Sequence, residues 1–264
     1  MKRVCALVIG CFALAAHAED WQATLTPAVP GPFPPPRPLH AIYRFGWAAV
    51  HAANGEFDIS KTEDGLLKFE VSVKTEGVVR KLWSLDATHT ALCNPATLRP
   101  VSALQKETYK KQKVKTTLAF DEKGVARLRV TKLAAKNPTK PKRFDFPGLF
   151  DLHTALLFVR SQPLKPGDTV RMVVYPTESA YLAEVEVGAR AKIEVGRKKY
   201  DAIRLDLKLR QITKKLELEA HDKFKRATAW LSDDRDRLLL KIEAEVFVGS
   251  VWAEMESVEF SDER

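Results

Sequence analysis

The chain is poor in cysteine. Only three cysteines occur in 264 residues, and two of them, Cys5 and Cys11, lie within the first eighteen. If that segment is removed, Cys93 is left alone, and a lone thiol cannot form a disulfide within the chain. Stability must therefore come from burial of apolar side chains, for which a domain of this length is large enough.

The apolar run at the N-terminus is too short to span a bilayer. Residues 4–15 follow Lys2 and Arg3, and they make about twelve residues where a spanning helix needs about twenty. Ala16-His17-Ala18 places small residues at the positions that a signal peptidase reads. We therefore predict a signal peptide over residues 1–18, cleavage near Ala18 and a periplasmic or secreted product. Lipidation at Cys11 is disfavoured because the apolar run before it is very short and continues past it.

Proline is concentrated near the start and is sparse elsewhere. Seven of the fifteen prolines lie within residues 19–38. Because proline fixes φ and extends its predecessor, this segment is predicted to be a polyproline-like linker, with a ligand for an aromatic-groove module as the alternative. The remaining residues, 39–264, are predicted to form a single domain.

Alternation of apolar and polar residues dominates this domain. Leu67, Phe69, Val71 and Val73 alternate with polar residues, and the pattern recurs at residues 113–120, 203–210 and 238–248. Such alternation is typical of antiparallel strands with one buried and one wet face. We predict a mostly all-β fold, an antiparallel meander of about twelve strands.

One segment has a helical period instead. Residues 151–162 begin with a cap-competent Asp151 and end before Pro163. The predicted helix is apolar nearly all round, which is typical of a buried helix. Since a curved sheet of about twelve strands leaves a lumen that its own side chains cannot fill, we predict that this helix plugs part of it.

Three patterned segments carry a family resemblance. They are Tyr43–Trp47 with the bend at 52–55, the helix from Asp151 leading to Gly167, and Ala229–Asp234 with the strand that follows as far as Ser250. On these, residues 39–260 resemble the exported bacterial family called domain of unknown function 3108. The resemblance implies a β-meander curled into a deformed, incompletely closed barrel in the cell envelope. It brings no catalytic residue.

Two residue pairs are of the types that catalytic sites use. His89 and Cys93 share one face of a predicted strand, as a Cys/His nucleophile would require, but Cys93 is more simply interpreted as a small, semi-buried packing residue. His153 could act as a general base, but Asp151 is two residues away and better interpreted as a helix cap. The remaining histidines lack metal-ligand spacing. We predict no catalytic residue, no metal site and no cofactor.

Basic and aromatic residues are the better candidates for binding. The net charge of +9 becomes +7 when Lys2 and Arg3 leave without any acidic residue. The candidate binding residues are Lys111, Lys113, Lys115, Trp47, Trp83 and Trp230. The three lysines, with a basic loop at 136–143, could meet anionic lipid head groups or acidic glycans, or could only keep an exposed sheet soluble. The tryptophans, with Trp252, could line a cavity or belong to the core.

These features favour a non-catalytic binding or assembly factor for an apolar, amphipathic or anionic envelope component, with the oligomeric state left open and a monomer assumed. The partner could be a lipid, a glycan, an envelope protein or an anionic membrane surface. Nucleic acid is not expected, because no basic motif is interleaved with aromatics. The alternative is a structural interaction protein with a filled barrel, and a third reading is a hydrolase that uses His153 or Cys93.

Overall fold

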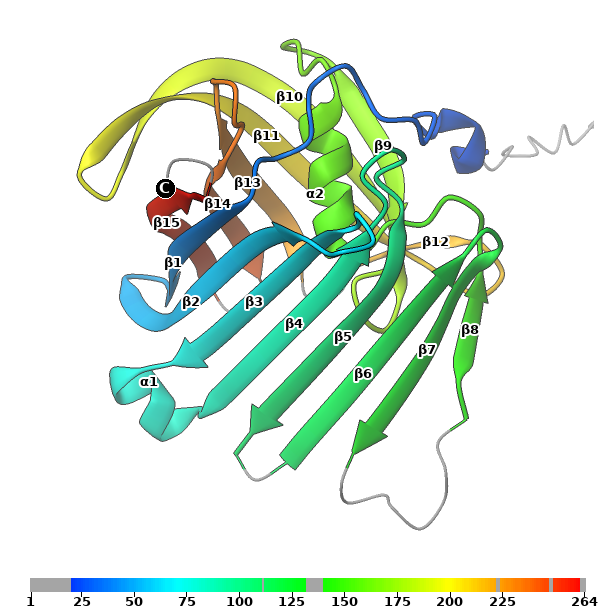
Figure 1. Ribbon diagram of the computed structural model, residues 1–264, viewed down its shortest axis with the longest axis horizontal. Helices are drawn as coiled ribbons and strands as arrows, with labels where there is room; N and C mark the ends of the chain where they lie inside the picture. Colours follow the sequence, from blue (N-terminus) through cyan, green and yellow to red (C-terminus); the bar gives the residue numbers. More distant parts are fainter. Residues whose placement is uncertain (1–19, 111, 132–139, 222–223, 247–248, 262–264) are drawn as a thin grey trace, which may run out of the picture.

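The computed structural model describes residues 20–110, 112–131, 140–221, 224–246 and 249–261. They form one antiparallel sheet of fifteen strands together with two α-helices and a 3-10 helix (Figure 1). The elements before the longer helix are η1 (Trp21–Thr24), β1 (Leu39–Trp47), β2 (Val50–Lys61), β3 (Leu67–Thr75), α1 (Gly77–Leu82), β4 (Leu85–Cys93), β5 (Pro100–Tyr109), β6 (Gln112–Asp121), β7 (Gly124–Thr131) and β8 (Lys142–Asp145). The later elements are α2 (Leu152–Ser161), β9 (Thr169–Val174), β10 (Ala180–Val195), β11 (Lys198–Ile212), β12 (Leu218–Ala220), β13 (Phe224–Ser232), β14 (Leu239–Val246) and β15 (Ser250–Phe260).

The strand order confirms the predicted meander. Each strand from β1 to β7 pairs with the strand that follows it in the sequence, so β8 forms one edge. On the other side β1 pairs with β15, and the sheet then continues through β14, β13, β11 and β10 to β9. The strands number fifteen rather than about twelve, in part because β8 and β12 have only four and three residues, too few for an alternation signal.

The sheet curls but does not close, because β8 and β9 remain its two ends. Side chains bridge this gap. Glu178, in the turn after β9, forms ion pairs with Arg127 (3.3 Å) and Arg129 of β7. Thr177 also donates a hydrogen bond from Oγ1 to Oε1 of Gln105 on β5, over 3.1 Å. The incompletely closed barrel that the sequence predicts is therefore the observed architecture.

Helix α2 lies between the two halves of the curled sheet (Figure 1). Its Leu157 packs in the apolar cluster built mainly from β1 to β7, whereas Phe158 and Val159 pack against β9, β10, β11 and β13. The predicted buried helix is thus confirmed, with Asp151 as its N-cap. No helix in the described ranges has both the length and the hydropathy of a membrane span.

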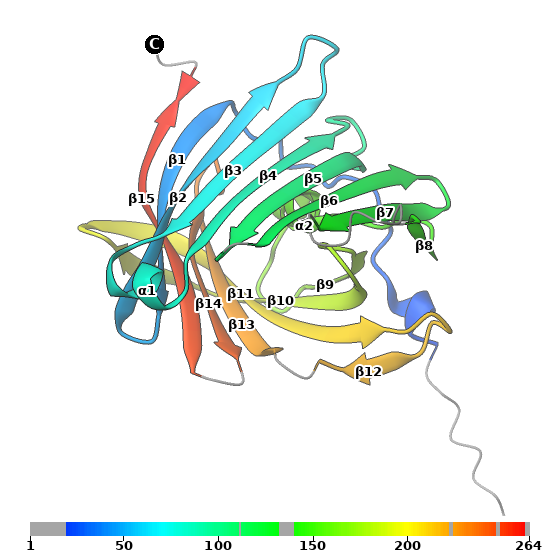
Figure 2. The ribbon, with the colours of Figure 1, turned by 90° about the horizontal axis from the view of Figure 1, so that it is seen from below.

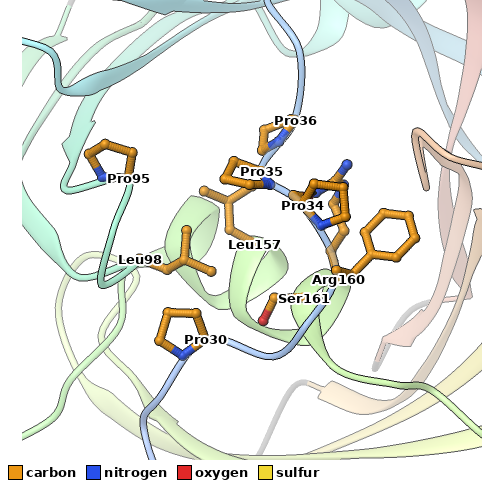
Figure 3. Close-up of a pocket in the computed structure, with 10 residues that line it drawn as sticks. Pro30, Pro34, Pro35, Pro36, Pro95, Leu98, Leu157, Arg160 and Ser161 are labelled. Atoms are coloured by element: carbon orange, nitrogen blue, oxygen red, sulfur yellow. Dashed lines mark hydrogen bonds between the residues drawn. The ribbon is translucent and has the colours of Figure 1, made fainter.

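The proline-rich segment lies along the domain instead of standing off as a spacer (Figure 3). Arg160 of α2 donates to the carbonyl of Pro34, and the guanidinium of Arg237 lies 3.7 Å from the Phe33 ring centroid. Gly31 donates its amide to Oγ of Ser161 over 3.0 Å. A cavity of about 30 Å³ remains between this segment and α2. Such a cavity is large enough for a water molecule but not for an organic ligand.

Candidate functional site

Burial on the inner face of the sheet is incomplete beyond α2. On β3, Leu67 and Phe69 are each 1% exposed and Val71 and Val73, the next residues on the same face, are half-buried, while Thr75 at the end of this row is buried again. On β11, Ile203 is fully buried. The two halves of the sheet that carry these strands face each other across the interior (Figure 2). An apolar wall therefore continues past the helix on both sides.

The β11 side repeats this gradient. Leu205 is buried next to Ile203, but Leu207 and Leu209 further along the same face are half-buried. At the N-terminal end of α2, Leu152 lies on the same helical face as Leu156. The Leu152 side chain is 59% exposed. Leu156 itself packs against the same buried cluster as Leu207 and Leu209. An exposed leucine at this point extends the apolar wall beyond the core.

Small residues flank the centre of this wall. Val73 pairs with Gly55 on β2 and with Ala87 on β4. A Cβ at Gly55 would come within 3.0 Å of Val73 and closer still to Phe45. The space above Gly55 is therefore taken by Phe45 and Val73 themselves, and Ala87 on the other side of Val73 is the small residue beside which an additional apolar group can lie.

A polar corner adjoins the wall. His89 of β4 and His153 of α2 come together, with 2.6 Å between Nδ1 of His89 and Nε2 of His153. The His153 ring also stacks on Phe69 at 5.2 Å between centroids. On the next strand, Gln105 is the register partner of His89 and donates to Glu107 over 2.9 Å. One apolar wall and one polar corner are the two surfaces that an amphipathic molecule needs.

Burial keeps the histidine pair neutral. Desolvation lowers the pKa of His153 to about 4, and desolvation followed by repulsion from His153 lowers the pKa of His89 to about 4. Both imidazoles are therefore uncharged at neutral pH and act as hydrogen-bonding groups. The only hydrogen bond of His89 within the described ranges is the one from Nδ1, so Nε2 of this half-buried ring is available to a ligand.

The neighbouring groups are held in unreactive forms. Burial, and then the nearby Asp151 charge, raise the pKa of the Cys93 thiol to about 12, so the thiol is protonated at neutral pH. Burial also raises the pKa of Asp151, whose Oδ1 accepts from both the amide and the hydroxyl of Thr154. The hydrogen bonds of Asp151 match its predicted role as a cap. No three His, Cys, Asp or Glu side chains within the described ranges are grouped to hold a metal.

The six predicted binding residues do not converge on one place. Lys111 lies outside the described residues, and Lys113 and Lys115 are exposed on β6. Trp47 and Trp83 are 50% and 48% exposed at one end of the sheet. Trp47 and Trp83 therefore do not line a cavity together with Trp230 and Trp252, which lie in the groove described next.

Trp230 lines a groove on the opposite face from α2. This groove, of about 830 Å³, also contains Trp252 and rows of charged side chains from β10 to β15. Its charges are largely paired: Lys241 lies 2.7 Å from Glu243 and 2.8 Å from Glu254. The groove is lined by four basic and five acidic residues, so its net charge of −1 gives a ligand of one sign little to recognise.

The histidine pair and the uncovered wall were missed by reasoning from the sequence. His89 and His153 are 64 residues apart, and only the topology brings them together. The half-buried wall did have a signal, because the alternation on β11 continues to Leu209 without a break.

The comparisons with known proteins agree with this fold. A family profile described as "Protein of unknown function (DUF3108)" matches residues 42–256. A search of curated proteins finds no match. The solved structure of a beta-barrel-like protein of domain of unknown function DUF1849 from Brucella abortus is similar, with a TM-score of 0.61 at 8% identity, covering 86% of this chain and 99% of that one. A chain titled "putative lipoprotein" from Parabacteroides distasonis has a TM-score of 0.33 at 8% identity, with 88% and 99% coverage.

Proposed function

Because the chain belongs to the DUF3108 family of proteins of unknown function, its role has to be inferred from its own geometry, and we propose a non-catalytic binding protein for an amphipathic molecule. The apolar part of the ligand lies against the uncovered inner wall, next to Val73 and Leu209. Its polar end lies at the corner formed by His89 and Gln105. The observation that carries this proposal is the half-buried apolar stretch of the inner face past α2, formed by Val71 and Val73 of β3 and by Leu207 and Leu209 of β11.

The apolar character of the wall suits an acyl chain. Each buried methylene contributes about 0.8 kcal/mol, so roughly ten of them would contribute about 8 kcal/mol before the costs of association. A neutral His89 can hydrogen-bond a carboxylic acid, an ester or a hydroxyl without a buried charge of its own. This combination favours a lipid-like ligand over a small polar metabolite.

The proposed place of action is the cell envelope, outside the cytoplasm. Its support is the predicted signal peptide of residues 1–18, which lie outside the described residues, with cleavage near Ala18. The protein would then bind its ligand while the ligand moves between envelope compartments or surfaces.

A filling substitution tests the site. Val73→Trp adds a large apolar side chain between Gly55 and Ala87, where the proposed ligand lies. We expect saturable binding of a fluorescent fatty acid by the wild type, and at least tenfold weaker binding by Val73→Trp with an unchanged melting temperature. Ser72→Trp is the matched control, because Ser72 is exposed on the other face of the same strand.

Two results would overturn the proposal. The first is the absence of saturable binding by the wild type. The second is a large loss of stability in Val73→Trp alone, since a tightly packed interior would reject the added ring. That second result would favour the alternative of a filled barrel that acts only through its surface.

A further inference from the structure

Exposed apolar side chains gather at one end of the strands, the end that carries α1. Of the eleven large hydrophobic side chains that are exposed in the described residues, seven lie there. Six of them come from the β1–β2, β3–β4 and β5–β6 connections: Trp47, Val50, Val78, Leu82, Trp83 and Tyr109. The seventh, Val251, pairs with Trp47 across β1 and β15. We call these seven residues the apolar rim.

Antiparallel pairing places these connections side by side. Successive strands from β1 to β6 reverse direction, so every second turn falls at the same end of the sheet, the end that carries α1 in Figure 2. Direct contacts join them. The rings of Trp83 and Tyr109 meet edge to face at 6.1 Å, and the amide of Lys110 donates to the Ser84 carbonyl over 3.0 Å. The rim is therefore a continuous border rather than a set of separate loops.

Helix α1 presents the most exposed members of the rim. Val78 is 70% exposed and Leu82 is 76% exposed, on a helix with no buried residue among its six. Single exposed apolar residues are ordinary on protein surfaces, but a cluster with aromatic members marks an interaction surface. Val78 and Leu82 contribute little to packing within the chain, and the charges around them indicate which partner would cover them.

The charges differ between the two ends of the sheet. Residues 74–86 and 107–115, which carry most of the rim, include seven basic and three acidic residues. Five turns at the opposite end, residues 62–66, 94–99, 121–124, 196–197 and 233–238, include seven acidic and five basic residues. The apolar residues are thus found at the basic end.

We propose that the apolar rim docks the protein on the surface of a bilayer that contains anionic phospholipids. Tryptophan and tyrosine favour the level of the lipid head groups, where their apolar rings and polar atoms are both accommodated. Lysines close behind them, such as Lys81 and Lys110, attract the anionic head groups. A ring of turn tips with aromatic and aliphatic side chains suits shallow insertion better than the flat contact of a folded protein partner.

Docking on a bilayer is a separate proposal from ligand binding, because it rests on the exposed side chains and the charges of the rim and not on the inner wall. It also gives the binding site an orientation, because the half-buried part of the inner wall lies toward the same end of the strands as the rim: Val73 is two residues before Thr75, which leads into α1. The open end of the sheet would then face the membrane.

Vesicle sedimentation tests the rim directly. The secreted protein is mixed with vesicles of phosphatidylcholine containing 30% phosphatidylglycerol at about 0.1 M salt, where the Debye length is about 10 Å. We expect binding by the wild type and at least tenfold weaker partitioning by the double variant Val78→Ser/Leu82→Ser, which changes no charge. Val29→Ser is the matched control, because Val29 is 66% exposed but lies in the N-terminal segment, away from the rim; it should bind within twofold of the wild type.

A second measurement reports on depth. Brominated acyl chains should quench the tryptophan fluorescence of the wild type, and Trp47→Phe/Trp83→Phe should lose most of that quenching. The proposal is overturned if the wild type ignores the anionic vesicles at low salt, as a rim that binds only protein would do, or if the serine variants bind as well as the wild type. Val73→Trp should bind vesicles normally, so that failure here and failure of the proposed ligand site remain distinguishable.

Discussion

Strand β11 passes through two different environments on one face. Ile203 and Leu205 are 0% and 2% exposed beneath α2, whereas Leu207 and Leu209 continue the same row in a half-buried state. Strand β3 shows the same change between Phe69 and Val71. The apolar alternation therefore extends further than core packing requires. The first region explains why the domain is stable, and the second indicates what the domain binds.

The comparison is tested most strongly by truncating one residue in each region. Ile203→Ala should destabilise the protein by about 3 kcal/mol, because it opens a cavity under α2. Leu209→Ala should cost about 1 kcal/mol or less, because its site is half-buried. Urea unfolding measures both, and Lys208→Ala, exposed on the other face, should be nearly silent. Equal losses at Ile203 and Leu209 would show that the two regions are packed alike.

Acidification should affect the border between the regions. His89 and His153 have a pKa of about 4 in the folded protein and about 6.5 when unfolded. The unfolded chain therefore binds more protons between these values, so stability is complete above pH 6.5 and is lost as the pH falls toward 4. With about 1.4 kcal/mol for each pKa unit, we expect a loss on the order of a few kcal/mol. The pH dependence of urea midpoints should show it, and His153→Gln should flatten the slope between pH 6.5 and 4. A wild-type urea midpoint that does not change between pH 6.5 and 4 would show that the two histidines are exposed to solvent in the folded protein.

A smaller effect is expected at Cys93, on the sealed side. The thiol is fully buried and its pKa is raised to about 12, so a thiol-reactive dye should label it only on unfolding. Cys93→Ala should cost roughly 1–2 kcal/mol and leave fatty-acid binding unchanged. Rapid labelling of the folded protein would contradict its burial, and loss of binding would bring Cys93 into the site.

The fold was largely predictable because its signals are local. Alternation reports one buried face for each strand, which was enough for the antiparallel meander, and Asp151 marks the start of α2. The six-residue helix α1 was missed, since one and a half turns give no measurable period. The contacts of residues 20–38 were missed as well, because proline content predicts backbone conformation but not the surface against which a segment packs.

The site was less predictable, because alternation does not say which strands meet across the interior. Trp47 and Trp230 were grouped as candidates for one cavity, yet they lie at the rim and on the outer groove. The pairing of His89 with His153 depends on how far α2 enters the sheet, which no spacing encodes. The exposed Val78 and Leu82 did have a signal, namely apolar residues within a turn between two strands.

Native mass spectrometry of the purified protein tests the central claim most directly. The account predicts a population whose mass exceeds that of the chain by one amphipathic molecule, which is retained in Ser72→Trp and lost in Val73→Trp. After delipidation, the wild type should regain that mass increment on incubation with a long-chain fatty acid. A wild-type protein that stays at the mass of the bare chain, both as purified and after incubation, would contradict the account.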